Sequence, residues 1–141
     1  MFEADEAAVR DELLDSAIDP AAHEVGEELL YLREGHSPQL LKQLRRGRFS
    51  VEDEIDLHQM NDRSARVTLD EFLAECKRRG VRCARIVHGK GLRSGSVGPV
   101  LKRMTDRVLR RRDDVLAFAS ARPAQGGTGA TVVLLRGSRR R

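Results

Sequence analysis

The sequence predicts an α/β domain over residues 50–136, whose elements follow one another in the order β-α-β-α-β-β. Four short stretches rich in apolar residues have the length and pattern of strands. Between the first three of them lie two longer stretches with apolar residues at helical spacing. Two such crossover helices imply that the first three strands are parallel, with right-handed connections. The last two strands could pair directly or through an intervening neighbour.

The first predicted strand, residues 53–58, alternates between apolar and polar side chains. Ile55 and Leu57 fall on one face, whereas Asp56 and His58 fall on the other. This pattern is typical of a strand with one buried and one accessible face. Asp56 and His58 are therefore expected to be accessible at the end of the strand.

The rest of the domain is predicted by helix caps, apolar runs and turns. Asn61 is a plausible N-cap for a helix over 62–79, and Gly80 ends it. Residues 81–87 read as a buried strand, followed by a glycine-rich loop, and Ser96 can then cap a second helix. The apolar positions expected to face inward on that helix are Val97, Val100, Leu101, Met104 and Val108. Strands are predicted at 115–119 and 130–136.

Residues 1–49 are predicted to form a helical arm and linker in front of this domain. Helices are expected at 4–17 and 21–33 from apolar residues at helical spacing. A shorter helix should begin at Pro38, which suits the first helical position, and end at Gly47. The last five residues, 137–141, form a basic tail.

Charge is divided unevenly along the chain. Residues 1–34 hold eleven Asp or Glu and two Arg, a net charge of −9, and the remainder has a net charge of +13. The basic body could bind a polyanion. The acidic arm could fold back onto the body or dock on a basic partner, and charge runs also occur on solvated helices.

Composition excludes several classes of protein. Cys76 and Cys83 have no metal-type spacing and are expected to be buried, reduced thiols, and no metal site is predicted. The chain has no signal peptide and no run long enough to span a membrane, which indicates a soluble, cytoplasmic protein without a membrane partner. Aromatic residues make up 4% of the chain, which argues against RNA recognition by an aromatic stacking sheet.

Candidate catalytic residues stand where the first two strands end. Asp56 and His58 close the first strand, and residues 88–91, His-Gly-Lys-Gly, follow the second. If these strands are neighbours, Asp56, His58 and His88 lie at one edge of the sheet, where α/β folds bind ligands. Read alone, each segment is equally consistent with a simple turn.

Positive charge and glycine amides accompany these residues. Lys90 and Arg93 in the loop and Arg85 on the second strand could contact a phosphate backbone. The loop lacks the spacing of a Walker phosphate loop. The later Gly-Gly-Thr-Gly at 126–129 reads as a turn before the last strand, although its amides could line the same cleft.

Together, three segments resemble the Smr (small MutS-related) domain family. They are IDLHQ at 55–59, HGKG at 88–91 and GGTG at 126–129. The resemblance covers residues 50–136 and implies a two-layer fold with a four-stranded mixed sheet, similar to the C-terminal domain of translation initiation factor 3. Gln59 stands where the family usually has glycine, which would let a substrate backbone approach closely. The lead-in at 40–49 also resembles that of stand-alone bacterial members.

The resemblance implies endonuclease activity on RNA or DNA, in some members on messenger RNA at stalled ribosomes. RNA is favoured over DNA here, and the ribosome is a candidate partner. We expect His58 to act as general acid or base beside Asp56, because histidine can take up and release a proton near neutral pH. His88 would assist or position the phosphate.

Other residues are expected to bind the nucleic acid without taking part in proton transfer. Lys90 and the loop amides would offset charge on the phosphate in the transition state. The residues expected to contact nucleic acid are Lys90, Gly89, Gly91, Arg93, Arg85, Gly127 and Gly129.

No cofactor is predicted, and cleavage is expected to be independent of metal. One carboxylate and two histidines provide too few oxygen ligands for Mg²⁺, which prefers oxygen. Three alternatives remain: a DNA-nicking protein, a nucleic-acid or ribosome-binding module without catalysis, and a scaffold that works through the acidic arm. The oligomeric state is left open.

Overall fold

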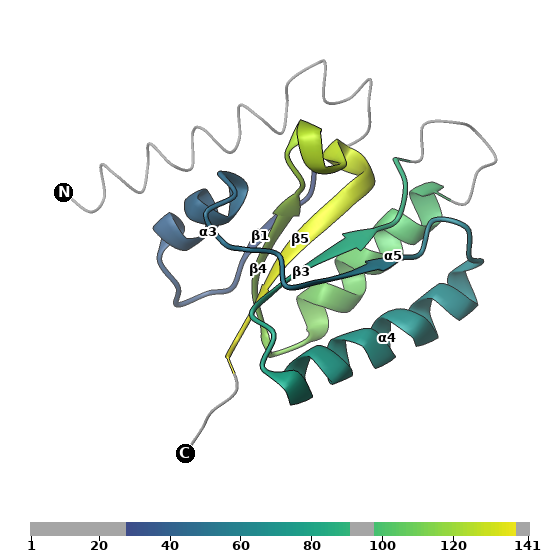
Figure 1. The fold of residues 1–141 in the computed structure, drawn as a ribbon, viewed down its shortest axis with the longest axis horizontal. Helices are drawn as coiled ribbons and strands as arrows, with labels where there is room; N and C mark the ends of the chain where they lie inside the picture. Colours follow the sequence, from purple (N-terminus) through teal and green to yellow (C-terminus); the bar gives the residue numbers. More distant parts are fainter. Residues whose placement is uncertain (1–27, 91–97, 138–141) are drawn as a thin grey trace.

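A mixed five-stranded sheet forms the centre of the fold (Figure 1). The computed structural model describes residues 28–90 and 98–137. Along the sheet the strands lie in the order β1-β4-β5-β3-β2. Their bounds are β1 (Leu30–Leu32), β2 (Asp53–Asp56), β3 (Cys83–Val87), β4 (Val115–Ser120) and β5 (Ala130–Leu135). The helices are α3 (Pro38–Arg45), α4 (Asp62–Arg79) and α5 (Gly98–Arg111), with two 3₁₀ turns, η1 (Pro123–Gln125) and η2 (Gly127–Gly129).

Strand directions agree with the predicted crossovers. β2 pairs with β3 in parallel, and β5 pairs antiparallel with both β3 and β4. β2, β3 and β4 therefore run the same way, as expected for strands separated by crossover helices. The last two strands pair directly, and β5 lies between β3 and β4. The sequence had left both of these arrangements open.

One expectation about the arm is wrong. Residues 30–32 lie within the segment expected to form a helix over 21–33, but they form β1, which pairs antiparallel with β4. Without it, β4 would be an edge strand with unpaired backbone groups. Tyr31 stacks on Phe118 of β4, with ring centroids 5.1 Å apart. The sheet consequently has five strands where four were predicted. The helix expected at 4–17 lies outside the described residues.

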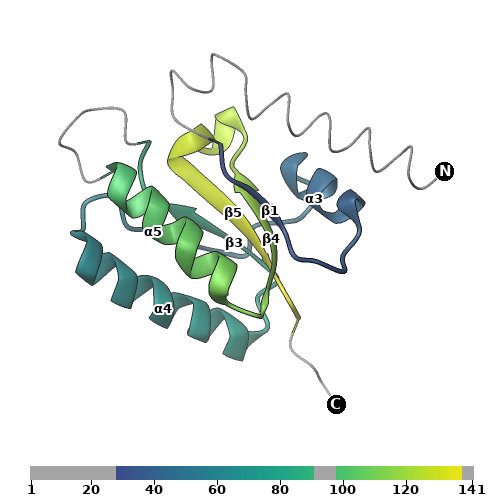
Figure 2. The ribbon, with the colours of Figure 1, turned by 180° about the vertical axis from the view of Figure 1, so that it is seen from behind.

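Helices cover both faces of the sheet (Figures 1 and 2). α4 and α5 pack on one face, which gives the predicted two layers, and α3 covers part of the other face. Along β5, Val132 and Leu134 pack in the apolar cluster on the α3 side, whereas Val133 and Leu135 pack in the cluster beneath α4 and α5. This alternation assigns each strand residue to one face.

The helix ends follow the predicted caps where they are described. Asn61 Oδ1 accepts the N–H of Ser64 at 2.8 Å, and Gly80 ends α4 with φ of +73°. α3 begins at Pro38, as expected. Val100 of α5 was expected to face inward, but 42% of it is exposed. Ser96 and Val97 lie outside the described residues.

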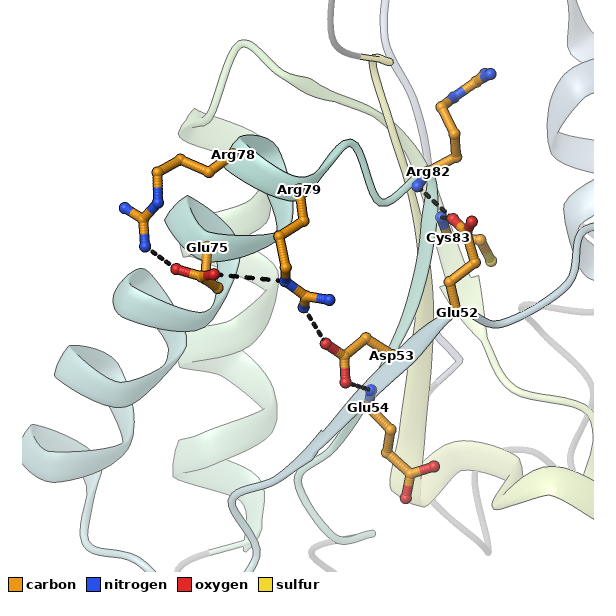
Figure 3. Close-up of polar contacts among 8 residues, drawn as sticks. All are labelled: Glu52, Asp53, Glu54, Glu75, Arg78, Arg79, Arg82 and Cys83. Carbon is orange, nitrogen blue, oxygen red and sulfur yellow. Dashed lines mark hydrogen bonds and ion pairs between the residues drawn. The ribbon is translucent and has the colours of Figure 1, made fainter.

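The start of β2 is fixed by polar contacts to α4 and β3 (Figure 3). Asp53 forms an ion pair with Arg79 at the end of α4. Glu52 Oε1 accepts the backbone N–H groups of Arg82 at 2.6 Å and Cys83 at 3.2 Å. Exposed ion pairs contribute little to stability, but these contacts hold β2 in register with β3. That register determines where Asp56 lies at the other end of the strand.

Among the helices within 28–90 and 98–137, none combines the length and apolar character needed to cross a bilayer.

Candidate active site

The three motif segments meet at one edge of the sheet. The end of β2 pairs with the end of β3, and the end of β3 pairs with the start of β5. Leu57 N donates to Val87 O at 2.7 Å. Gly129 O accepts the N–H groups of both His88 and Gly89, at 3.0 and 2.9 Å. The first two motifs therefore follow neighbouring strands, which was the condition for their meeting, and the third motif lies directly against the second.

Asp56 and His58 form an exposed, hydrogen-bonded pair. His58 Nδ1 lies 2.5 Å from Asp56 Oδ1, and the His58 backbone N–H donates to the same oxygen at 3.0 Å. About half of each side chain is exposed, 48% for His58 and 53% for Asp56. The Nδ1–H therefore donates to the carboxylate, which leaves Nε2 as the ring atom that can exchange a proton with a substrate.

The backbone contact also determines the charge state of Asp56. The N–H of His58 lowers the pKa of the Asp56 carboxyl below its usual value, and the His58 side chain lowers it further. Asp56 is thus an anion at neutral pH. An anion beside the ring favours the imidazolium that forms when the histidine takes up a proton.

Leu57 directs the two polar side chains outward. It is fully buried in the apolar cluster beneath α4 and α5. Because side chains alternate along an extended chain, burial of Leu57 directs Asp56 to the other side. Met60 N donates to Leu57 O at 3.0 Å and closes the turn that carries His58.

His88 is not brought to the surface with this pair. Its side chain is fully buried. Nδ1–H donates to Gly89 O at 2.8 Å, and Nε2 accepts the Thr131 hydroxyl at 2.8 Å. Burial lowers the pKa of His88, because the charged ring would lose its water; the bond to Gly89 O opposes this shift and the Lys102 charge adds to it, and the resulting pKa is about 4. A neutral ring with both nitrogens occupied holds the turn into the HGKG segment in place but does not reach a phosphate.

Three of the glycines expected to present amides to a ligand use them within the protein. Gly89 N donates to Gly129 O, Gly127 N to Arg122 O and Gly129 N to Gly126 O. Gly129 is needed for close packing, because a Cβ there would lie 3.1 Å from Lys90 Cγ. A side chain at residue 129 would press against Lys90 where the loop after β3 meets the loop before β5.

Two of the basic residues expected at the site are described. Lys90 is exposed beside Gly129. Arg85 binds the Glu54 carboxylate through Nη2 at 2.5 Å and donates from Nη1 to Gln125 O at 3.1 Å. Its charge is thus partly compensated within the sheet. Gly91 and Arg93 lie outside the described residues.

Sequence reasoning did not single out Phe49, Arg122 and Gln125, which line a cavity beneath α3. Phe49 ends the lead-in at 40–49, and Arg122 and Gln125 precede the GGTG segment without a motif of their own. Only the packing of α3 on the sheet brings them together. Within residues 28–90 and 98–137, no cluster of three or more His, Cys, Asp or Glu has the arrangement of a metal site.

The fold and the site define a small α/β domain with an exposed Asp-x-His pair at one edge of the sheet. Two glycine-rich loops meet at the same edge. The Smr domain family matches residues 55–136, more than half of the chain. The chain belongs to the Smr domain family.

Similar proteins from bacteria carry the same domain. The chain is 38% identical over 105 residues to the ribosome rescue factor SmrB of Serratia proteamaculans, an alignment that covers 74% of this chain and 56% of that protein. It is 40% identical over 105 residues to SmrB of Pectobacterium carotovorum, with 74% and 55% covered. The chain therefore spans a little more than half the length of these relatives.

Two crystal structures share the fold. YdaL of Escherichia coli, a stand-alone small MutS-related protein, has a TM-score of 0.71 at 30% identity and covers 79% of this chain and 86% of its own. The Smr domain of Thermus thermophilus MutS2 has a TM-score of 0.53 at 37% identity, with 60% and 98% covered.

Proposed function

We propose that this chain is an endonuclease that cleaves RNA with the Asp56–His58 pair. The observation that carries the proposal is the exposed imidazole held 2.5 Å from an ionised carboxylate. Such a pair can take up a proton in one step and release it in the next. The site lies at the strand ends of an α/β sheet, where ligands of such folds bind.

The chemistry needs only groups of the RNA and of the chain. His58 Nε2 removes the proton of a ribose 2′-hydroxyl, and the oxygen attacks the neighbouring phosphorus. The bond to the 5′-oxygen then breaks, and that oxygen takes up the proton that His58 Nε2 removed from the 2′-hydroxyl. The products are a 2′,3′-cyclic phosphate and a 5′-hydroxyl. Asp56 orients the ring and stabilises the imidazolium, while the Lys90 ammonium group offsets charge on the phosphoryl oxygens.

We assign His88 a positioning role in this reaction. Its bonds to Gly89 and Thr131 tie the HGKG segment to β5. That segment carries Lys90, whose backbone lies against Gly129. A neutral buried histidine therefore determines where the cationic side chain stands relative to the exposed pair.

Similar proteins named ribosome rescue factors support an action on RNA at the ribosome. Arg46 and Arg48, which directly follow α3, are exposed and could bind a polyanionic partner. We therefore propose that the substrate is RNA engaged by ribosomes. Cleavage itself does not depend on that partner and can be tested on the isolated chain.

The experiment compares RNA and DNA oligonucleotides of the same sequence, each with and without a chelator. We expect cutting of RNA alone, unchanged by the chelator, with 2′,3′-cyclic phosphate ends. Nicking of DNA, or RNA cutting that the chelator abolishes and Mg²⁺ restores, would contradict the internal-nucleophile mechanism.

Binding of nucleic acid without cleavage is the second candidate function. The observation that favours it is the exposed Gln59, which stands directly after His58 where the family usually has glycine. Its side chain could keep a phosphate away from the ring. This function would be supported if the wild-type chain binds RNA without cutting it and the Gln59→Gly variant cuts it.

A further inference from the structure

A cavity of about 370 Å³ lies between α3 and the sheet, on the face opposite α4 and α5. The chain between α3 and β2 forms one wall, and strands β3, β4 and β5 form the floor. The residues that line it are Leu44, Arg45, Gly47, Phe49, Ser50, Val51, Cys83, Ser120, Arg122, Gln125 and Val132. Its volume lies at the small end of the range for ligand sites, about 300–1,000 Å³.

The cavity opens on the same sheet face as the Asp56–His58 pair. Glu54 and Asp56 alternate with Ile55, which packs beneath α4 and α5, so both carboxylates are on the α3 side. Arg85 connects the two places. Its Nη2 binds Glu54, two residues before Asp56, and its Nη1 binds the backbone oxygen of Gln125 in the cavity wall.

The lining combines apolar and cationic groups. Leu44, Phe49 and Val132 supply apolar surface, and among residues 28–90 and 98–137 no Asp or Glu lines the cavity. Burial raises the pKa of the Cys83 thiol to about 11, so this residue is an uncharged part of the floor. The apolar side chains can contact a planar, weakly polar ring, and an arginine of the lining can bind an anion attached to that ring.

Arg122 is held at the cavity by the turn after α3. Its Nη1 donates to Arg46 O at 3.2 Å. A Cβ on Gly47 would lie 2.8 Å from that same nitrogen, so the guanidinium packs directly against the Gly47 backbone. The Arg45 charge is partly compensated by Glu28, at 3.7 Å. Arg122 is therefore the cation best placed to bind an anion here.

We propose that this cavity binds one nucleotide of single-stranded RNA, with the base against Phe49 and a phosphate on Arg122. The inference rests on the proposed RNA substrate and adds a place where the strand is bound on the same sheet face as the cleavage site. A base on an aromatic side chain contributes about 10-fold in affinity. A cation on the phosphate makes that affinity sensitive to salt.

The test titrates the full chain, labelled with ¹⁵N, with each of the four ribonucleoside monophosphates and with ribose 5-phosphate as a ligand without a base. We expect saturable amide shifts at Ser50, Cys83 and Gln125 with at least one nucleotide, and much smaller shifts with ribose 5-phosphate. Shifts that are absent from these residues, or equal with the ligand that lacks a base, would overturn the proposal.

Two variants with matched controls test the same claim on single-stranded RNA that carries 2′-fluoro groups and cannot be cut internally. Ser50→Trp fills the cavity mouth and should weaken binding about 10-fold, whereas Val67→Trp on the exposed side of α4 should not. Arg122→Gln should weaken binding and reduce its salt dependence. Arg136→Gln, which also loses one bond to a backbone oxygen, should leave both unchanged.

The outcomes separate this inference from the proposed function. Neither measurement requires cleavage, so loss of nucleotide binding would overturn the cavity proposal while cutting by the Asp56–His58 pair could still be observed. Nucleotide binding in a chain that does not cut RNA would support the cavity and contradict the nuclease. If Ser50→Trp binds RNA more tightly than the wild type, the tryptophan has displaced a competitor of RNA from the cavity. The occupant would then be the acidic segment before Glu28, and the proposal would be overturned.

Discussion

Asp56 Oδ1 accepts two hydrogen bonds from His58, one from the backbone N–H at 3.0 Å and one from ring Nδ1 at 2.5 Å. The first bond fixes the turn, and the second fixes the ring within it. A single carboxylate oxygen thus determines both the position and the tautomer of the proposed catalytic histidine.

Asp56→Asn should reduce kcat for RNA cleavage with little change in KM. An amide oxygen can still accept the His58 backbone N–H, but it carries no charge to stabilise the imidazolium. We expect a loss of about 10-fold or more, smaller than the 10²–10⁴-fold that proton transfer itself contributes. Asp70→Asn, on the exposed side of α4 and paired with Arg66, is the matched control. Equal rates for Asp56→Asn and wild type would contradict the orienting role.

His88 should make the protein less stable in mild acid. Its pKa is about 4 in the folded chain against an ordinary value of 6.5, so between these values the unfolded chain binds more protons. Its contribution is complete above pH 6.5 and is lost as pH falls through 4. Because one pKa unit is worth about 1.4 kcal/mol, the free energy of unfolding should fall by about 3 kcal/mol across this window.

Chemical denaturation between pH 7 and pH 4 measures this dependence. His88→Gln lacks the titrating ring, so its stability should vary less with pH by that amount, whatever its stability at pH 7. His36→Gln, in the loop before α3, should keep the wild-type slope. Identical slopes for His88→Gln and wild type would show that His88 is not held neutral by burial.

Gly129→Ala should impair cleavage more than its effect on folding explains. The new Cβ would stand 3.1 Å from Lys90 Cγ and 3.4 Å from Lys90 N, so Lys90 must move by a few tenths of an ångström. Since a misplacement of about 1 Å can cost about 100-fold, we expect a loss of up to about 10-fold in kcat/KM. Gly35→Ala is the control, because it strains a residue at φ of +93° in open space away from the site. Both variants should lose stability, but only Gly129→Ala should lose activity.

Gln59→Gly should lower KM for RNA while leaving kcat nearly unchanged. Gln59 is exposed beside the catalytic pair, and removal of its side chain lets the substrate backbone approach His58 more closely. The added backbone freedom should cost about 0.5–1 kcal/mol of stability. Steady-state kinetics on one RNA oligonucleotide measure both parameters. A higher KM would instead mean that Gln59 contacts the substrate.

Local patterns predicted the parts of the fold that local physics determines. Alternation at 53–58 placed Leu57 inside and Asp56 and His58 outside, as observed. The caps of α3 and α4 were predicted from Asn61, Gly80 and Pro38, because a cap depends on neighbours within a few residues. The segment at 21–33 has helical spacing, but β1 forms there because the open edge of β4, far along the chain, offers backbone partners.

The candidate site was predicted only in part for the same reason. That the three motifs meet follows from the strand order β5-β3-β2, which the sequence left open. Burial of His88 depends on Thr131, 43 residues away, and nothing in the local sequence reveals that bond. The amides of Gly89 and Gly129 were expected to face a ligand, yet they bind partners that only the folded loops provide. The cavity beneath α3 likewise has no local signature.

The cleavage rate of one RNA oligonucleotide by wild type, His58→Ala and His36→Ala, with RNA binding measured in parallel, tests the catalytic role of His58 most directly. We expect His58→Ala to lose at least about 10²-fold in rate and to bind RNA as tightly as wild type, whereas His36→Ala cuts normally. Equal cutting by His58→Ala and wild type would contradict the claim that the Asp56–His58 pair carries out the reaction.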